Sequence, residues 1–358
     1  MQLDALDDLC SAAEDRDGTI EWDWRDHTRV GHGGEGDCHW ERDFTRTAAP
    51  MTPDGVGQVF ESSYPASRLR PADDYCTFRA AAAQYLGVES DQVVPTPGAM
   101  GAIRLAIDVT VEADDRVAIP RPSFAEYERE VRLQGATPSF VPEEALLELD
   151  PDPYALVIVA VPNNPTGWLP DDRRLTRLAE RCRDAETPLL IDETYLAFAD
   201  RVSMAGLSGA IVVRSPATTF GLPGLRAGFA VSSGRLLDRL DAGRLPWSIG
   251  RPAEAAIVHC MDSPDFVQTA RRVVASERER IREALPASVD AAPSSAPFLL
   301  LELADSAAVD RLLDVGHERG IAIRDARSFR GLDAHARVAV RSPTDNDALI
   351  ETIRAAVE

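Results

Sequence analysis

The most informative absence in this sequence is lysine, because all 38 residues in its Lys+Arg count are arginine. The chain therefore carries no primary amine on any side chain. A lysine amine is the group with which many enzymes form covalent imines to carbonyl compounds, and a lysine with a lowered pKa also serves as a general base. Any carbonyl chemistry of this protein must proceed without a covalent lysine link.

Positive charge is also scarce relative to negative charge, and the net charge is −21. Nucleic-acid binding rests on cationic contacts to phosphate, and anionic membranes attract basic segments, so we expect neither partner. Abundant Asp and Glu with arginine but no lysine is typical of the cytosol of extreme halophiles, where salt screens the self-repulsion of acidic surfaces. An ordinary acidic protein from a GC-rich genome is the alternative interpretation.

Cysteines are few and scattered, and none of the 5 belongs to a CxxC pair. This pattern argues against a disulfide framework and against a zinc site. No apolar run approaches the roughly 20 residues of a membrane span. The acidic N-terminus does not resemble a secretory signal. We expect a cytoplasmic protein without a metal ion.

Apolar runs alternate with helical patterns from about Tyr75 onward, which predicts a parallel sheet with crossover helices. The helical patterns include Gly101–Val109 and Asp171–Arg183. The predicted buried strands are Val117–Ile119, Leu156–Val161, Leu189–Ile191, Ile211–Val213 and Gly228–Val231.

The pattern changes after about Arg251, where a long charged helix, Asp265–Leu285, precedes shorter elements. These predicted elements are Phe298–Leu303, Ala307–Arg319, Ile321–Arg324, Arg337–Val340 and a last helix. The change predicts an N-terminal helix and arm over residues 1–45, a large domain over 46–250 and a small α+β domain over 251–358.

Two polar motifs directly follow predicted strands, where the ligands of open α/β sheets gather. Asp192-Glu193-Thr194-Tyr195 comes after one strand, and Asn163-Asn164-Pro165-Thr166-Gly167 comes after another. The plain alternatives are an Asp that begins a turn and a turn punctuated by Pro and Gly.

Other motifs supply small and cationic residues that suit a phosphate. Small residues between a predicted strand and a helix let backbone N–H groups approach a phosphate, at Gly98, Ala99 and Met100. Ser215 and Arg226 lie downstream, and an arginine can hold phosphate oxygens bidentately.

In their order along the chain, these motifs resemble those of the pyridoxal-phosphate (PLP) enzymes of the aspartate aminotransferase fold. The resemblance implies an α/β fold with a large, mostly parallel-sheet PLP domain and a smaller C-terminal α+β domain. It implies that Asp192 pairs with the pyridine nitrogen and that Asn164 and Tyr195 contact the ring oxygen. The aromatic ring of Phe124 would stack on the cofactor, and the alternative for Phe124 is an ordinary core residue. The implied cofactor-binding residues are Gly98, Ala99, Met100, Phe124, Asn164, Asp192, Tyr195, Ser215 and Arg226.

The same resemblance places Thr218 where the family has its cofactor-linking lysine, between Ser215 and Arg226. A threonine hydroxyl forms no imine and is a poor base near neutral pH. Loss of general acid–base help alone typically removes about 10²–10⁴ in rate. We therefore expect PLP to bind noncovalently, with Tyr195 as a candidate acid beside Thr218.

Several stretches resemble one branch, the threonine-phosphate decarboxylases of cobalamin biosynthesis, which are relatives of histidinol-phosphate aminotransferase. Among them are His32-Gly33-Gly34 and Leu245-Pro246-Trp247-Ser248. The branch implies decarboxylation of L-threonine O-3-phosphate to (R)-1-amino-2-propanol O-phosphate. Arg341 matches its substrate-carboxylate arginine, and His32 and Arg324 are candidates for the substrate phosphate. Arg337 is a weaker candidate, with a surface or strand-pairing charge as the alternative.

Two other functions remain open at this point. The chain could be an aminotransferase for another phosphorylated substrate such as histidinol phosphate, which would require a keto acid. It could also be a non-catalytic homologue that binds PLP or a metabolite. The resemblance further implies a homodimer with active sites at the subunit interface.

Overall fold

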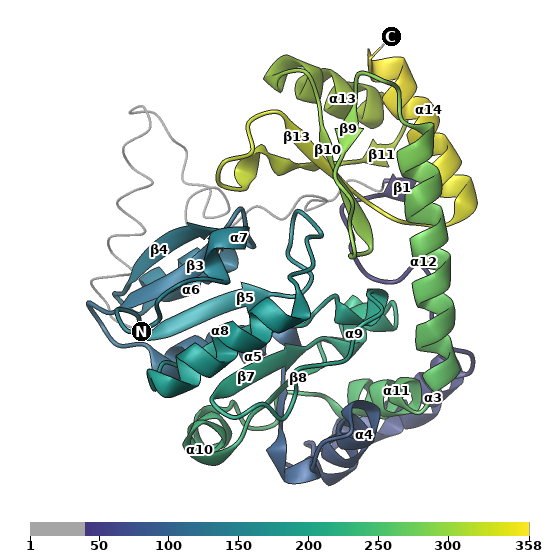
Figure 1. Cartoon of the computed structure of the whole chain (residues 1–358). Helices are drawn as coiled ribbons and strands as arrows, with labels where there is room; N and C mark the ends of the chain where they lie inside the picture. The colour runs from purple at the N-terminus through teal and green to yellow at the C-terminus, as the bar shows by residue number, and fades with distance from the viewer. Residues whose placement is uncertain (1–39, 358) are drawn as a thin grey trace, which may run out of the picture.

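A computed structural model describes residues 40–357 and arranges them in a larger lobe and a smaller lobe (Figure 1). The larger lobe is built on a seven-stranded sheet, and the smaller lobe carries sheets of four and two strands. Most of the expected N-terminal helix and arm, including His32, lies outside the described residues. Among residues 40–357, no helix is long and apolar enough to cross a membrane.

The large sheet has the strand order β2-β8-β7-β6-β5-β3-β4. Its strands β3 to β7 are mutually parallel, and β8 alone runs against its neighbours β7 and β2. The bounds are β2 (Val93–Thr96), β3 (Arg116–Arg121), β4 (Thr137–Pro142), β5 (Leu156–Ala160), β6 (Leu189–Asp192), β7 (Ala210–Arg214) and β8 (Gly228–Val231). The predicted mostly parallel sheet is confirmed, and the strands predicted from apolar runs are all present.

The bounds of strand β2 and the whole of strand β4 escaped prediction for a physical reason. Strand β2 is only four residues long and includes Pro95, and β4 begins and ends beside prolines while lying at the edge of the sheet. Proline cannot donate to a sheet ladder and therefore argues against a strand in a sequence pattern.

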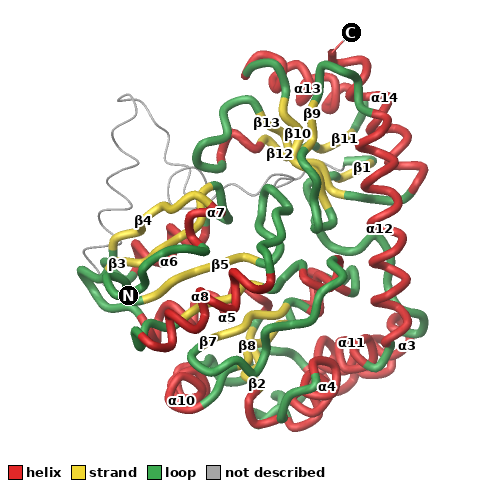
Figure 2. The backbone as a smooth tube through the Cα atoms, viewed as in Figure 1, coloured by secondary structure: helices red, strands yellow, loops and turns green. Residues whose placement is uncertain are grey.

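Helices cover both faces of the large sheet, as the tube in Figure 2 shows. Alternate residues of β5 point to opposite faces: Ile158 packs with α5, and Val157 and Val159 pack with α8. The helices of this lobe are α3 (Val56–Ser63), α4 (Cys76–Leu86), α5 (Gly98–Thr110), α6 (Glu126–Leu133), α7 (Glu143–Leu146), α8 (Asp172–Asp184), α9 (Pro216–Thr219), α10 (Gly234–Gly243) and α11 (Arg251–Met261). Short 3₁₀ turns occur at Tyr64–Arg68, Ser90–Gln92, Leu196–Phe198 and Pro223–Leu225.

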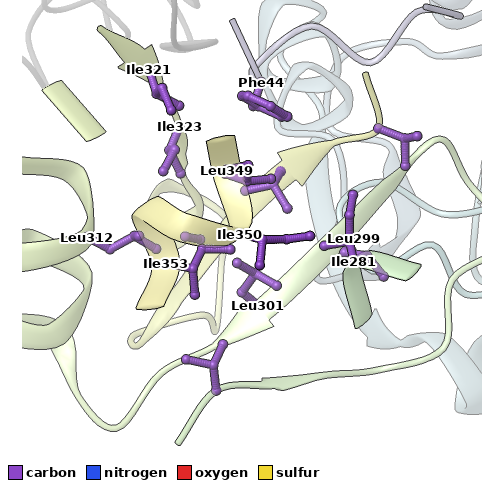
Figure 3. Close-up of a cluster of buried hydrophobic side chains, with 14 of the residues drawn as sticks. Phe44, Ile281, Leu299, Leu301, Leu312, Ile321, Ile323, Leu349, Ile350 and Ile353 are labelled. Atoms are coloured by element: carbon purple, nitrogen blue, oxygen red, sulfur yellow. The ribbon is translucent and has the colours of Figure 1, made fainter. Parts of the chain in front are cut away.

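The small lobe packs its strands against three helices around a core that Figure 3 shows in close-up. In this core Phe44, from the chain that precedes the large lobe, lies with Leu299 and Ile353. The elements are β1 (Arg42–Asp43), α12 (Pro264–Ala284), β9 (Asp290–Ala291), β10 (Phe298–Glu302), α13 (Ser306–Glu318), β11 (Ile321–Ala322), β12 (Arg324–Asp325), a 3₁₀ turn at Ala326–Ser328, β13 (His335–Ala339) and α14 (Pro343–Val357).

The lobes are linked by α12, which runs along the side of the molecule from α11 to the small lobe (Figure 1). Helix α11 itself packs against α3 and α4, and its Ile257 and Cys260 join the apolar cluster around Phe78. The packing therefore groups α11 with the larger lobe, although it lies beyond residue 250. The division at residues 45 and 250 stays a prediction.

The fold brings several strand ends to one edge of the large sheet. Strands β2, β5, β6 and β7 share a direction, and their carboxyl ends lead to Gly98, Asn164, Asp192 and Ser215. Ligands of open α/β sheets bind at this edge.

Candidate active site

A cavity of about 140 Å³ lies at this edge of the sheet. It brings together all of the predicted cofactor-binding residues except Gly98, which directly precedes two of them at the start of α5. The predicted residues that line it are Ala99, Met100, Phe124, Asn164, Asp192, Tyr195, Ser215, Thr218 and Arg226.

The carboxylate of Asp192 lies at the last position of β6 and is only 7% exposed. One of its oxygens accepts a hydrogen bond from the Tyr127 hydroxyl at 2.5 Å. The other accepts from the Thr194 backbone N–H at 2.9 Å. No arginine forms an ion pair with Asp192 within the described part of the chain, so the carboxylate is available to a cationic group in the cavity.

The N-terminus of α5 and Arg226 form the anion-binding end of the site. Gly98 has a φ of 80°, and a Cβ at this position would lie 2.8 Å from Nη2 of Arg226. Glycine therefore permits the guanidinium to lie against the positive end of a 13-residue helix. Among residues 40–357 no carboxylate pairs with Arg226, whose Nη1 donates to the Pro223 carbonyl at 3.1 Å.

The aromatic and amide groups of the cavity are held by specific contacts. The ring of Phe124 meets the ring of Tyr127 edge-on, with centroids 5.5 Å apart. The side-chain oxygen of Asn164 accepts from Nη1 of Arg337 at 2.6 Å, which leaves the amide nitrogen as a donor.

The hydroxyl of Tyr195 shares a 2.7 Å hydrogen bond with Thr47 Oγ1. Burial raises the pKa of Tyr195, although Arg337 and the Thr47 hydrogen bond act in the opposite direction. The phenol consequently stays protonated at neutral pH and can donate a proton.

Thr218 lies in the short helix α9. Its Oγ1 shares a 2.8 Å hydrogen bond with Oγ of Ser215, and its carbonyl accepts from the Ala49 backbone N–H at 3.0 Å. Thr218 lines the first cavity and also a neighbouring one, so it lies where the two spaces meet.

The second cavity has a volume of about 260 Å³ and is strongly cationic. Among residues 40–357, its lining includes Arg46, Arg324 and Arg337 and contains no acidic residue. It shares four residues with the first cavity, namely Phe124, Asn164, Tyr195 and Thr218. An anionic ligand in this space would reach the cofactor-binding residues.

The guanidinium of Arg337 is 5% exposed and has no carboxylate partner within residues 40–357. It lies over the rings of Phe298 and Phe329, and its Nη2 donates to the Thr45 carbonyl at 3.2 Å. Burial lowers the pKa of Arg337 to about 10, so it remains a cation at neutral pH. A buried cation of this kind is stabilised by an anionic ligand.

Arg324 lies beside Arg337 across the β12–β13 ladder and is 6% exposed. Its Nη2 donates to Ser328 Oγ at 2.8 Å, and its guanidinium stacks over Phe329. The two guanidinium groups thus reach the cavity from neighbouring strands.

One predicted substrate residue, Arg341, is not brought to this site. Arg341 lines neither cavity, because β13 ends at Ala339 and the chain turns there into α14. Its backbone N–H donates to Asn346, and its charged neighbours are Asp345, Arg46 and Asp43. His32 lies outside the described residues.

Sequence reasoning missed two residues of the site and underestimated a third. Tyr127 follows Phe124 by three residues, a spacing that could have signalled their ring contact, although Phe124 lies before the first residue of α6. Thr47 lies in an irregular segment with no pattern to mark it. Arg337 is not a surface charge, although the ladder does pair it with Arg324.

The chain is also similar to a known protein family and to individual known proteins. The model of the family aminotransferase class I and II matches residues 60–353. Histidinol-phosphate aminotransferase 2 of Archaeoglobus fulgidus is 33% identical over 296 residues, which cover 79% of this chain and 83% of that protein.

Solved structures also resemble the chain. One is the L-threonine-O-3-phosphate decarboxylase of Porphyromonas gingivalis, with a TM-score of 0.78 and 25% identity over 88% of this chain and 99% of that one. Another is the histidinol-phosphate aminotransferase of Sinorhizobium meliloti in complex with pyridoxal-5'-phosphate, with a TM-score of 0.81. Its 20% identity, over 89% of this chain and 91% of that one, speaks for the fold alone.

Proposed function

Since this chain belongs to the class I and II aminotransferase family, whose enzymes use PLP, we propose that it decarboxylates L-threonine O-3-phosphate to (R)-1-amino-2-propanol O-phosphate. The observation that supports this proposal is a cavity that opens on Thr218 and is lined, within the described part of the chain, by three arginines and no acidic residue. The substrate has a carboxylate and a phosphate, and both are anions that arginine binds well.

The described residues fit the cofactor. The N-terminus of α5 and Arg226, which has no acidic partner within residues 40–357, suit its phosphate. The buried carboxylate of Asp192 suits a protonated ring nitrogen, and Asn164 has an amide donor for the ring oxygen. When bound, PLP supplies an electron sink for the charge left on the α-carbon.

The absence of lysine favours decarboxylation over transamination. In decarboxylation, the bond from the α-carbon to the carboxyl carbon breaks and CO₂ leaves, so no base is needed for that bond. A proton must then be delivered to the α-carbon. The protonated hydroxyl of Tyr195, which lines both cavities, is our candidate donor.

We assign the substrate's anions to the two arginines that are buried in the second cavity. Arg337, rather than Arg341, would receive the carboxylate, because it lies in the cavity without an acidic partner. Arg324 would receive the phosphate, with Arg46 at the rim, where it is already paired to Asp43 at 2.6 Å.

An aminotransferase is the second candidate, and the 33% identity to a histidinol-phosphate aminotransferase favours it. Histidinol phosphate carries one anionic group, whereas threonine phosphate carries two. A cavity with two buried arginines therefore fits threonine phosphate better. A non-catalytic protein that binds PLP or a metabolite is the third candidate.

The test supplies the PLP-loaded protein, in high salt, with L-threonine phosphate labelled at its carboxyl carbon. The proposal predicts labelled CO₂ and aminopropanol phosphate in equal amounts, without any keto acid. Amine transfer that depends on a keto acid would establish the aminotransferase instead. Binding without either product would leave the third candidate. Asp192→Asn serves as the inactive control.

We also infer a homodimer. Five large apolar side chains that are at least 38% exposed occur in two segments, residues 60–69 and residues 245–247. The guanidinium of Arg70, next to the first segment, stacks on the ring of Trp247 in the second. These side chains are Phe60, Tyr64, Leu69, Leu245 and Trp247. Exposed apolar clusters of this kind mark protein–protein contacts.

A further inference from the structure

Tyr127 is a buried residue whose hydroxyl meets a cofactor-binding carboxylate. It is the second residue of α6 and has 0% exposure. Its hydroxyl donates to Oδ2 of Asp192 at 2.5 Å. This contact joins α6 to the carboxyl end of β6, two elements 65 residues apart in the sequence.

The hydrogen bond from Tyr127 completes the fixation of the carboxylate. The other oxygen of Asp192 accepts from the Thr194 backbone N–H, so each oxygen has one donor. Two donors on different oxygens restrict rotation of the carboxylate about its bond to Cβ. Each carboxylate oxygen can accept a further hydrogen bond, so Asp192 keeps the capacity to bind a ligand.

The same ring of Tyr127 also supports Phe124. Their rings meet edge-on at 5.5 Å with an interplanar angle of 87°, and both line the first cavity. One side chain therefore braces two of the groups assigned to the cofactor, a carboxylate and an aromatic face.

The hydroxyl of Tyr127 acts as a donor over the whole working pH range. Burial and the charge of Asp192 raise the pKa of Tyr127 well above its ordinary value. The phenol therefore stays protonated and keeps its direction of donation.

We propose that Tyr127 is a positioning residue that aligns the Asp192 carboxylate with the ring nitrogen of the cofactor. The inference rests on the cofactor role given to Asp192 above. Its energetic contribution is expected to be that of one hydrogen bond to a charged group, or about 10-fold in affinity.

The test measures dissociation constants for PLP and for its 1-deaza analogue, in which carbon replaces the ring nitrogen. Tyr127→Phe should weaken PLP binding about 10-fold but change binding of the analogue less than about 2-fold, because the analogue offers Asp192 no nitrogen. In an Asp192→Asn background, Tyr127→Phe should add no further loss for PLP.

Tyr75→Phe is the matched control. Tyr75 is equally buried, and among the described residues its hydroxyl bonds only to the backbone of Ile249, outside both cavities. This variant should leave both dissociation constants unchanged, and its unfolding temperature calibrates the structural cost of losing a buried hydroxyl.

Four results would overturn the positioning role. If Tyr127→Phe weakens the binding of PLP and of the analogue equally, the effect is merely structural. If Tyr127→Phe leaves PLP binding unchanged, Tyr127 does not position Asp192. Equal binding of PLP and the analogue by the parent protein would remove the role of Asp192. If the parent binds neither ligand, the proposed function fails as well, whereas in the other cases it survives.

Discussion

The guanidinium of Arg337 donates a 2.6 Å hydrogen bond to the side-chain oxygen of Asn164. This contact joins β13 of the small lobe to the loop after β5 in the large lobe. It lies where the two cavities meet, since Asn164 lines both of them. One contact between the lobes thus lies at the site itself, and a ligand that binds Arg337 would touch a residue that contacts both lobes.

Arg337→Gln should weaken binding of L-threonine phosphate by roughly 10- to 100-fold, because one to two charge-assisted hydrogen bonds are lost. PLP binding should change much less. The measurement is isothermal titration of the PLP-loaded protein with substrate. Arg341→Gln is the matched control and should have no effect, since Arg341 lines neither cavity. A larger loss with Arg341→Gln would restore the assignment made from sequence.

Thr218→Lys should create a covalent link to PLP, because it returns an amine to the boundary between the cavities. The expected sign is a gain of the cofactor's mass after borohydride reduction, seen by intact mass spectrometry. Arg235→Lys places a single lysine on the exposed surface of α10 and should show no adduct. A Thr218→Lys protein without an adduct would mean that Thr218 does not face the bound cofactor.

Leu245→Glu should dissociate the inferred dimer, because it places a charge in the exposed apolar cluster, where Leu245 is 65% exposed. Light scattering coupled to gel filtration measures the change in mass. Val202→Glu is the control, as Val202 is 87% exposed but belongs to a different surface. A parent protein that elutes as a monomer would refute the dimer.

Salt should stabilise the protein. At a net charge of −21, the acidic side chains repel one another. Salt weakens this repulsion, because the screening length falls from about 10 Å at 0.1 M to about 3 Å at 1 M. The unfolding temperature is expected to rise by about 10 °C or more over this range in KCl, as measured by calorimetry. An unfolding temperature that falls with KCl would show that the ion pairs outweigh the repulsion.

The sequence predicted most of the large lobe because its buried strands are continuous apolar runs, as in Leu156–Ala160. Asn164 and Asp192 were predicted together because each belongs to a polar motif that directly follows such a run. Arg337 and Arg341 could not be separated in the same way. Both are arginines of one C-terminal segment, and only the end of β13 at Ala339 decides which enters the cavity.

Contacts between segments that are distant in the sequence could not be predicted either. The hydrogen bond between Thr47 and Tyr195 spans 148 residues, and that between Tyr127 and Asp192 spans 65. No periodicity or residue spacing in the sequence indicates such a pair, because the contact results from how the lobes and helices pack.

Above all, we propose that this chain holds PLP in the Asp192 cavity without a covalent bond and uses it in catalysis. The most direct measurement is an absorbance titration of the protein with PLP, followed by borohydride reduction, intact mass analysis and addition of L-threonine phosphate. We predict saturable PLP binding that dialysis reverses, an unchanged protein mass after reduction, and release of CO₂ on addition of the substrate. Absence of PLP binding, or a reduced adduct on a side chain of the parent protein, would contradict the account.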